Sequence, residues 1–132
     1  MKQVVAAIIT REDKLLICQR AQDQPMALKW EFPGGKIEPG EEQPAALRRE
    51  LEEELGISAT IGEKLSSIQH HYRNGGAVEL HFYRVREYEG EMINRIFEQI
   101  RWVDRRELTR FDFLAADHDI VHQLANGKLL RD

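Results

Sequence analysis

The sequence predicts a mixed α/β domain in which strands surround one central helix and a second helix closes the chain. The central helix is indicated by Leu47, Leu51 and Leu55, because their i, i+4, i+8 spacing places them on one helix face. The strands are indicated by β-branched apolar runs and by alternating apolar and polar residues between turn sequences. Helices and strands mixed along the chain in this order are typical of the α/β class.

The chain of 132 residues is long enough for a buried core, so we expect a single domain over residues 1–132. Its 42% hydrophobic and 32% charged residues are typical of a globular protein rather than a disordered chain. The net charge of −4 argues against nucleic-acid binding, which needs a basic face. We expect a cytoplasmic protein without membrane contact, because no apolar stretch reaches membrane-spanning length and the apolar run after residues 1–3 is too short for a signal peptide.

The first half of the chain begins with a predicted hairpin. Residues 4–10 (VVAAIIT) are nearly all apolar and β-branched, which predicts a strand buried on both faces. Residues 11–13 form a polar turn, and residues 14–20 (KLLICQR) predict the second strand. The single cysteine, Cys18, lies in that strand and is expected to be buried. Residues 21–29 lack periodicity and predict a surface loop, a common place for specificity residues.

A loop, a helix and a second loop are predicted next. Residues 30–32 (WEF) indicate a short strand that residues 33–35 (PGG) end in a turn. The glycines also let the backbone approach a ligand closely and present a carbonyl oxygen to it. The helix is expected to begin within residues 41–44, where a proline fits the first turn, and to end at Gly56 as its C-terminal cap.

The second half of the chain predicts further strands and a closing helix. Residues 58–72 indicate a strand interrupted near Gly62, and residues 77–87 alternate as a strand after an Asn-Gly-Gly hairpin turn. Residues 98–104 predict another strand, followed by a capping-box pattern for a short helical turn. Residues 117–130 carry apolar residues at helical spacing and predict an amphipathic helix weakened at its end by Asn-Gly.

The central helix carries the strongest chemical pattern in the chain. Glu50, Glu53 and Glu54 stand at i, i+3 and i+4, so their carboxylates project from one helix face about one turn apart. Three carboxylates on one face repel each other unless a cation lies among them. Carboxylate oxygens are hard ligands that suit Mg²⁺ or Mn²⁺. This face therefore predicts a site for a divalent metal ion.

A second interpretation treats the helix as a solvated face with the ion pairs Arg48–Glu52 and Arg49–Glu53. The spacing over residues 35–57 decides between the two. It follows the pattern Gly, five residues, Glu, seven residues, Arg-Glu-apolar-x-Glu-Glu-x-Gly-apolar. The matching positions are Gly35, Glu41, Arg49, Glu50, Leu51, Glu53, Glu54, Gly56 and Ile57. Fixed residues at these spacings form a specific pattern, and the segment resembles the Nudix hydrolase family.

The resemblance, which extends from Val4 to about Leu124, implies an α-β-α sandwich around a mixed sheet with a loop-helix-loop catalytic motif. It also implies hydrolysis of a phosphoanhydride bond in a nucleotide by water, with Mg²⁺ or alternatively Mn²⁺ as cofactor. The metal ligands that it implies are Glu50, Glu53, Glu54, the carbonyl oxygen of Gly34 or Gly35, and Glu98. Glu98 has a second interpretation as a solvated strand residue. Glu50 and Glu53 are the candidates for the general base.

Other residues receive roles around this motif. The family pattern implies that Glu41 and Arg49 form a structural pair that holds the loop against the helix, for which an arginine is well suited. Arg20 and Lys36 are candidate phosphate contacts, with an exposed cation as the alternative for each. The substrate-binding residues that we assign are Arg20, Glu31, Phe32, Lys36, Tyr72 and Asp117. His71 and Phe113 are further aromatic candidates for stacking on the base.

Beyond the motif, the chain resembles the MutT-like branch of the family, which includes 8-oxo-dGTP diphosphatases and CTP pyrophosphohydrolases. The segments that carry this resemblance are VVAAII, WEFPGGKIEPGE and FDFLAADHDIV. In that branch an Asn or Asp entering the last helix binds the base, and Asp117 occupies this position. An ionised Asp only accepts hydrogen bonds, which favours an amino-bearing base unless burial protonates it. The alternative for Asp117 is an ordinary helix N-cap.

Three functions remain open. The first is a pyrophosphohydrolase that converts nucleoside triphosphates to monophosphate and pyrophosphate, acting on 8-oxo-dGTP or other damaged nucleotides, or on CTP and dCTP, as in nucleotide-pool sanitisation. The second is hydrolysis of ADP-ribose or another nucleoside diphosphate derivative, which the short chain disfavours. The third is a non-catalytic binding module, which the intact glutamates disfavour. We expect a monomer, with a dimer as the alternative.

Overall fold

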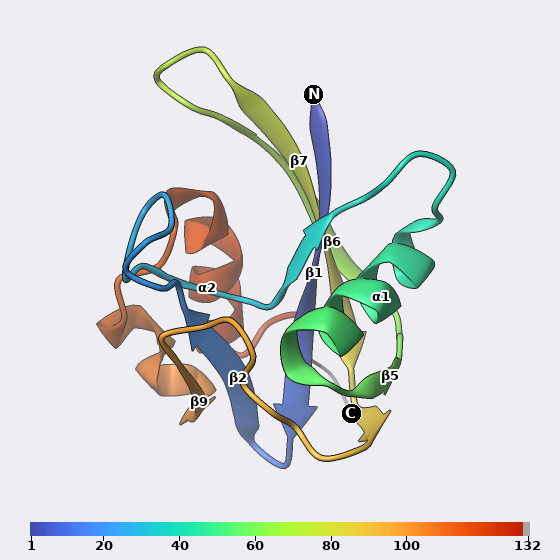
Figure 1. Cartoon of the computed structure of the whole chain (residues 1–132). Coiled ribbons are helices and arrows are strands. Elements are labelled where there is room, and N and C mark those ends of the chain that lie inside the picture. Colours follow the sequence, from blue (N-terminus) through green and yellow to red (C-terminus); the bar gives the residue numbers. More distant parts are fainter. Residues whose placement is uncertain (131–132) are drawn as a thin grey trace.

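The computed structural model describes residues 1–130 and confirms a mixed sheet with a helix on each face (Figure 1). In chain order the described elements are β1 (Lys2–Arg11), β2 (Lys14–Gln19), β3 (Trp30–Glu31), β4 (Gly34–Lys36), α1 (Gln43–Leu55), β5 (Ser58–Thr60), β6 (Lys64–His71), β7 (Ala77–Val85), β8 (Glu87–Glu89), β9 (Gln99–Asp104), the short 3₁₀ helices η1 (Arg105–Arg110) and η2 (Ala115–Asp117), and α2 (His118–Ala125).

Parallel and antiparallel pairs occur in the same sheet. Its strands follow the order β3-β2-β1-β7-β6, with β4 also paired to β1 and β9 to β2. The β1–β7 pair is parallel, whereas β1 pairs antiparallel with both β2 and β4. The β6–β7 hairpin forms around the predicted Asn-Gly-Gly turn and extends beyond the end of β1 in Figure 1. A separate small sheet pairs β5 with β8.

The two faces of β1 contact different helices, which explains why this strand is apolar along its length. Val5, Ala7 and Ile9 are buried with the apolar face of α1. Ala6 and Ile8 point to the opposite face, where they are buried with α2. Successive strand residues point to opposite sides of the sheet, so a strand covered on both sides needs apolar residues at every position. The predicted sandwich of two helical layers around a sheet is therefore confirmed.

One predicted turn is wrong. Gly34 and Gly35 do not form a turn but belong to β4, where they pair with Ala6 and Val5 of β1. A Cβ atom on Gly34 would lie 2.0 Å from the carbonyl oxygen of Val5, so a side chain there would push the strands apart. The preceding WEF strand is correspondingly shorter than predicted and ends at Glu31. The glycines serve a close approach of two strands, which their turn propensity conceals in the sequence.

The helix ends are explained by local sequence. Pro44 lies in the first turn of α1, and Gly56 ends the helix with a left-handed φ of 69°, as predicted. The capping box between Asp104 and Glu107 is also confirmed. The predicted extension of the last helix to residue 130 is wrong, because α2 ends at Ala125 before the turn that contains Gly127. No helix within residues 1–130 is long and apolar enough to cross a membrane.

Leu51 tests the contribution of α1 to the core, because its side chain is fully buried against the sheet. Replacing Leu51 with alanine is expected to lower the free energy of unfolding by about 3 kcal/mol, through lost burial and the cavity left behind. Urea unfolding followed by circular dichroism measures this. Arg48→Ala, on the exposed side of the same helix, is the control and should change the value by less than about 0.5 kcal/mol. An equal loss in both variants would contradict the assignment of the buried face.

Candidate active site

A cavity of about 440 Å³ opens between β1, β4, β7 and the loops at the end of β2 and before β9. Many of the residues assigned to the site from the sequence line it: Arg20, Glu31, Phe32, Gly34, Gly35, Lys36, Glu54, Tyr72 and Asp117. The structure thus brings together residues from segments that are almost 100 positions apart in the chain. Glu41, Arg49, Glu50, Glu53 and Glu98 lie outside the cavity lining.

Two carboxyl groups of α1 are drawn together at the end of the cavity formed by β4. The carboxyl of Glu54 is buried and accepts a hydrogen bond from the Gly34 N–H at 3.2 Å. Burial and, secondarily, the nearby Glu50 raise the pKa of Glu54 to about 9. Burial also raises the pKa of Glu50, against the opposing effect of Arg49. A pair of carboxyls in this state retains a proton unless a cation compensates their charge.

The backbone of β4 lies against Glu50. A Cβ atom on Gly35 would be only 2.5 Å from the carboxyl carbon of Glu50, so any side chain there would occupy the place of the carboxylate. The absence of a side chain lets the carboxylates of Glu50 and Glu54 lie close to the backbone of β4. Carboxylate and carbonyl oxygens are the donors that Mg²⁺ and Mn²⁺ prefer, so these residues fit a hard divalent cation.

The remaining predicted side-chain ligands, Glu53 and Glu98, are more exposed than this pair. Among residues 1–130, no group of three or more His, Cys, Asp or Glu side chains is arranged to hold a metal ion. The Glu53 side chain is 58% exposed and contacts Arg49 at 3.4 Å. Glu98 is exposed, and its backbone N–H donates to the carbonyl of Gln19 at 2.9 Å. Metal ligation by Glu53 and Glu98 therefore stays a prediction.

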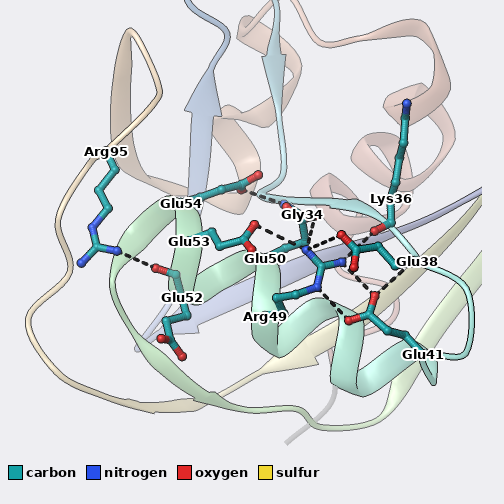
Figure 2. A network of polar contacts seen from close by, with 10 residues as sticks. All are labelled: Gly34, Lys36, Glu38, Glu41, Arg49, Glu50, Glu52, Glu53, Glu54 and Arg95. Atoms are coloured by element: carbon teal, nitrogen blue, oxygen red, sulfur yellow. Dashed lines mark hydrogen bonds and ion pairs between the residues drawn. The ribbon is translucent and has the colours of Figure 1, made fainter.

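Arg49 connects the loop before α1 with the acidic face of the helix (Figure 2). Its Nε and Nη2 donate to the two carboxylate oxygens of Glu41 at 2.7 and 2.8 Å, a bidentate pair. Its Nη1 donates to Glu50 at 3.1 Å, and Nη2 also reaches the carbonyl of Lys36 at 3.1 Å. The hydrogen bonds from Arg49 lower the pKa of Glu41 to about 2. The guanidinium therefore holds the loop, the end of β4 and the helix together, as expected for the Glu41–Arg49 pair.

The cations near the cavity have different surroundings. Arg20 donates through Nη1 to the carboxylate of Glu31 at 3.2 Å and through Nε to the carbonyl of Pro25 at 2.8 Å. It therefore links the cavity wall to the loop of residues 21–29. Burial raises the pKa of Glu31, and the contact with Arg20 opposes this rise. Lys36 is exposed, and its side chain borders the cavity.

Asp117 lies on the cavity wall at the entrance of α2 and is only 4% exposed. Its side chain makes no capping hydrogen bond to the helix, which contradicts the alternative role as an N-cap. Burial and, to a smaller extent, the charge of Glu31 raise the pKa of Asp117 well above its usual value. A carboxyl that keeps its proton both donates and accepts hydrogen bonds, whereas a carboxylate only accepts.

An apolar wall completes the cavity. Val4, Val78 and Leu80 come from one face of the sheet, and the sequence analysis did not assign them to the site. Alternation along β7 places Val78 and Leu80 on a common face, but the pattern does not reveal that this face adjoins a cavity. Ile96 and Phe97, in the loop before β9, were also missed. The stacking candidates His71 and Phe113 do not line the cavity: His71 is exposed, and Phe113 is buried in the core.

Comparison with known proteins identifies relatives of the whole domain. The NUDIX domain model matches residues 1–124. The CTP pyrophosphohydrolase of Escherichia coli (strain K12) is 41% identical over 117 residues, which is 89% of this chain and 86% of that protein. An 8-oxo-dGTP diphosphatase of Haemophilus influenzae is 38% identical over 125 residues, covering 94% of this chain and 91% of the relative.

The fold is found in solved structures as well. The crystal structure of a MutT NUDIX hydrolase from Burkholderia pseudomallei superimposes with a TM-score of 0.80 at 26% identity. The match covers 92% of this chain and 96% of that one. The sequence and structure comparisons therefore agree over nearly the full length of the domain.

The buried carboxyl of Asp117 predicts a characteristic pH dependence of stability. Because its pKa is higher in the folded than in the unfolded chain, its contribution is fully present at low pH and is lost as the pH rises from about 4 through the folded pKa. Asn cannot ionise, so Asp117→Asn should gain about 1 kcal/mol or more of stability relative to wild type between pH 5 and pH 8. Urea unfolding at both pH values measures this. Asp23→Asn, in an exposed loop, should follow the wild type; a constant difference between Asp117→Asn and wild type would contradict the prediction.

Proposed function

This chain belongs to the NUDIX hydrolase family, and from that premise we propose that it cleaves nucleoside triphosphates into a nucleoside monophosphate and pyrophosphate. The observation that carries the proposal is the shape of the cavity. Its lining combines the buried carboxyl of Glu54 and the close backbone of β4 with an apolar wall and Asp117. A phosphate chain with cations suits the first group of residues, and a base suits the second. The relatives named CTP pyrophosphohydrolase and 8-oxo-dGTP diphosphatase support this reaction class.

Nudix hydrolases generally depend on a divalent metal, and for this chain we assign Mg²⁺, with Mn²⁺ as a substitute. Glu50, Glu54 and a carbonyl of Gly34 or Gly35 would hold it, and Glu53 and Glu98 are further candidate ligands. When bound, the ion neutralises phosphate charge and orients the phosphate chain for in-line attack by water.

The residues of the chain supply the proton transfer and the positioning. Glu50 and Glu53 are the candidates for accepting the proton of the attacking water on a carboxylate oxygen. Arg49 donates to both of them and so holds the two carboxylates next to each other. Lys36, an exposed residue of the cavity lining, is the candidate phosphate contact. Arg20, already bonded to Glu31, acts by holding the loop that borders the site.

For the base, the cavity offers apolar surface and one buried acid, Asp117. Phe32 and Tyr72 provide aromatic surface for the base, and Asp117 provides the polar contact. With its proton retained, Asp117 donates to a ring nitrogen or carbonyl and accepts from an amino group. This widens the expected range of bases beyond the amino-bearing ones that a carboxylate would favour. The negative net charge of the chain disfavours nucleic acid as a partner and is consistent with free nucleotides as substrates. We assign the enzyme as a cytoplasmic monomer.

The acidic face of α1 is tested by single replacements. Glu50→Gln, Glu53→Gln and Glu54→Gln each remove one charge with little change of shape. Each is expected to lower kcat for pyrophosphate release by about 100-fold or more, because a metal ligand or the proton acceptor is lost. Glu52→Gln, exposed on the same helix and pointing away from the site, is the matched control and should retain wild-type activity. Chelation of divalent ions should abolish turnover, and added Mg²⁺ should restore it.

A wild-type rate in Glu53→Gln would remove that residue from the mechanism. Turnover of ADP-ribose with no pyrophosphate released from any triphosphate would contradict the proposal. It would identify the protein as a hydrolase of nucleoside diphosphate derivatives.

Base selection by Asp117 is tested with one panel of substrates: CTP, dCTP, 5-methyl-dCTP, dATP, 2-hydroxy-dATP, dGTP and 8-oxo-dGTP. We expect wild type to prefer some of these bases, and Asp117→Ala to reduce kcat/KM for the preferred base by about 10-fold or more while poor substrates change little. The measurement is initial-rate pyrophosphate release at saturating Mg²⁺. A uniform loss across the panel would show that Asp117 supports the fold of the site rather than reading the base.

A further inference from the structure

The loop between β8 and β9, residues 90–98, caps the C-terminal end of α1. The N–H groups of Ile93 and Arg95 donate to the carbonyls of Leu55 at 2.9 Å and Glu54 at 3.1 Å. The Arg95 guanidinium donates through Nη1 to the carbonyl of Glu52 at 3.0 Å (Figure 2). The last carbonyls of a helix have no partner within the helix itself. The loop supplies donors from a distant part of the sequence to the carbonyls of Glu54 and Leu55. Arg95 adds a second donor to the carbonyl of Glu52, which also accepts from the Gly56 N–H at 3.0 Å.

Arg95 also supplies a charge that the helix lacks. No basic residue lies in the last turn of α1, although a cation there is favoured by the negative end of the helix dipole. The guanidinium lies directly against Gly56, where a Cβ atom would be 3.0 Å from Nη2 and 3.3 Å from Cζ. Gly56 therefore has two functions: it adopts the left-handed conformation that ends the helix, and it leaves room for the guanidinium of Arg95.

The turn that Arg95 holds contains Glu54. The side chain of Glu54 accepts a hydrogen bond from β4, and its backbone carbonyl accepts one from Arg95, so the residue is fixed from two directions. The next residues in the loop, Ile96 and Phe97, line the cavity. Asn94 stabilises this turn by accepting from the Phe97 N–H at 2.8 Å and donating to the Phe97 carbonyl at 2.9 Å. Arg95 and its loop thus connect the last turn of α1 with two residues of the cavity wall, Ile96 and Phe97.

We propose that Arg95 is a positioning residue for the hydrolytic reaction. By fixing the last turn of α1 it sets the place of the Glu54 carboxylate, and by anchoring its own loop it sets the place of Ile96 in the cavity wall. The role rests on the proposed function, since the reaction positioned is triphosphate hydrolysis. Arg95 itself is exposed and does not line the cavity, so it acts through Glu54 and the loop rather than by touching the substrate.

The test compares Arg95→Gln and Arg95→Lys with a control, Arg48→Gln. The control removes an exposed arginine from α1, the helix that Arg95 caps. The first readout is Mn²⁺ affinity of the nucleotide-free protein, measured by electron paramagnetic resonance of the free ion. Arg95→Gln should weaken Mn²⁺ binding about fivefold, because a displaced Glu54 is a poorer ligand. Arg95→Lys should recover part of the loss, and Arg48→Gln should match wild type.

The second readout is steady-state hydrolysis of the triphosphate that wild type cleaves fastest. Arg95→Gln should lower kcat about 10-fold with KM changed less than about twofold, since positioning acts on the chemical step rather than on uniform binding. Hydrogen exchange should show faster exchange of the Leu55 and Gly56 amides in the same variant.

A cap that serves only stability would give a different result. If Arg95→Gln lowers the melting temperature but leaves Mn²⁺ affinity and kcat unchanged, the proposal is overturned. If Arg95→Gln does not fold, Asn94→Ala replaces it, because it loosens the same loop while keeping Arg95; unchanged Mn²⁺ affinity in that variant overturns the proposal, and weaker binding supports it. If wild type binds Mn²⁺ but cleaves no triphosphate, the proposed function fails, while the Mn²⁺ comparison still decides the role of Arg95.

Discussion

The contact between β4 and α1 determines where the other parts of the site lie. Gly34 pairs with β1 at a distance that no side chain permits, and Gly35 leaves room only for the carboxylate of Glu50. Glu54 reaches the same strand through the Gly34 N–H. A carboxyl that is removed from water is costly to ionise, so this close packing favours positive charge next to the backbone of β4. The cation and phosphate chain that we propose for this site would compensate packing that is otherwise unfavourable.

Helix α1 is held by two arginines from different parts of the chain. Arg49, within the helix, connects its N-terminal half to the preceding loop through Glu41. Arg95, from a loop forty residues farther along the chain, binds the carbonyls of the last turn. An arginine suits both places because its planar group donates several hydrogen bonds in fixed directions. The carboxylates between these anchors are thereby kept in place with little freedom to move.

Burial has a different consequence for Asp117, which also lines the cavity. Asp117 is enclosed beside the apolar wall and lies near the charge of Glu31, and both effects favour its protonated form. The same physical cause, desolvation of a carboxyl, thus has two consequences in one cavity. Beside α1 it favours the cation that we propose, and beside α2 it creates a group that both donates and accepts hydrogen bonds.

The β1–β2 hairpin, the amphipathic face of α1 and the carboxylate spacing of Glu50, Glu53 and Glu54 were determined by the sequence alone, because they depend on local periodicity and on residues close together in the chain. The tertiary structure alone decided that Glu53 turns toward Arg49 and solvent while Glu54 is buried, since helical spacing places side chains on a face but does not say what covers it. It also decided the pairing of the glycines with β1, the apolar wall and the capping by Arg95. Each of these depends on contacts between segments distant in sequence, whose burial and charge no local pattern records.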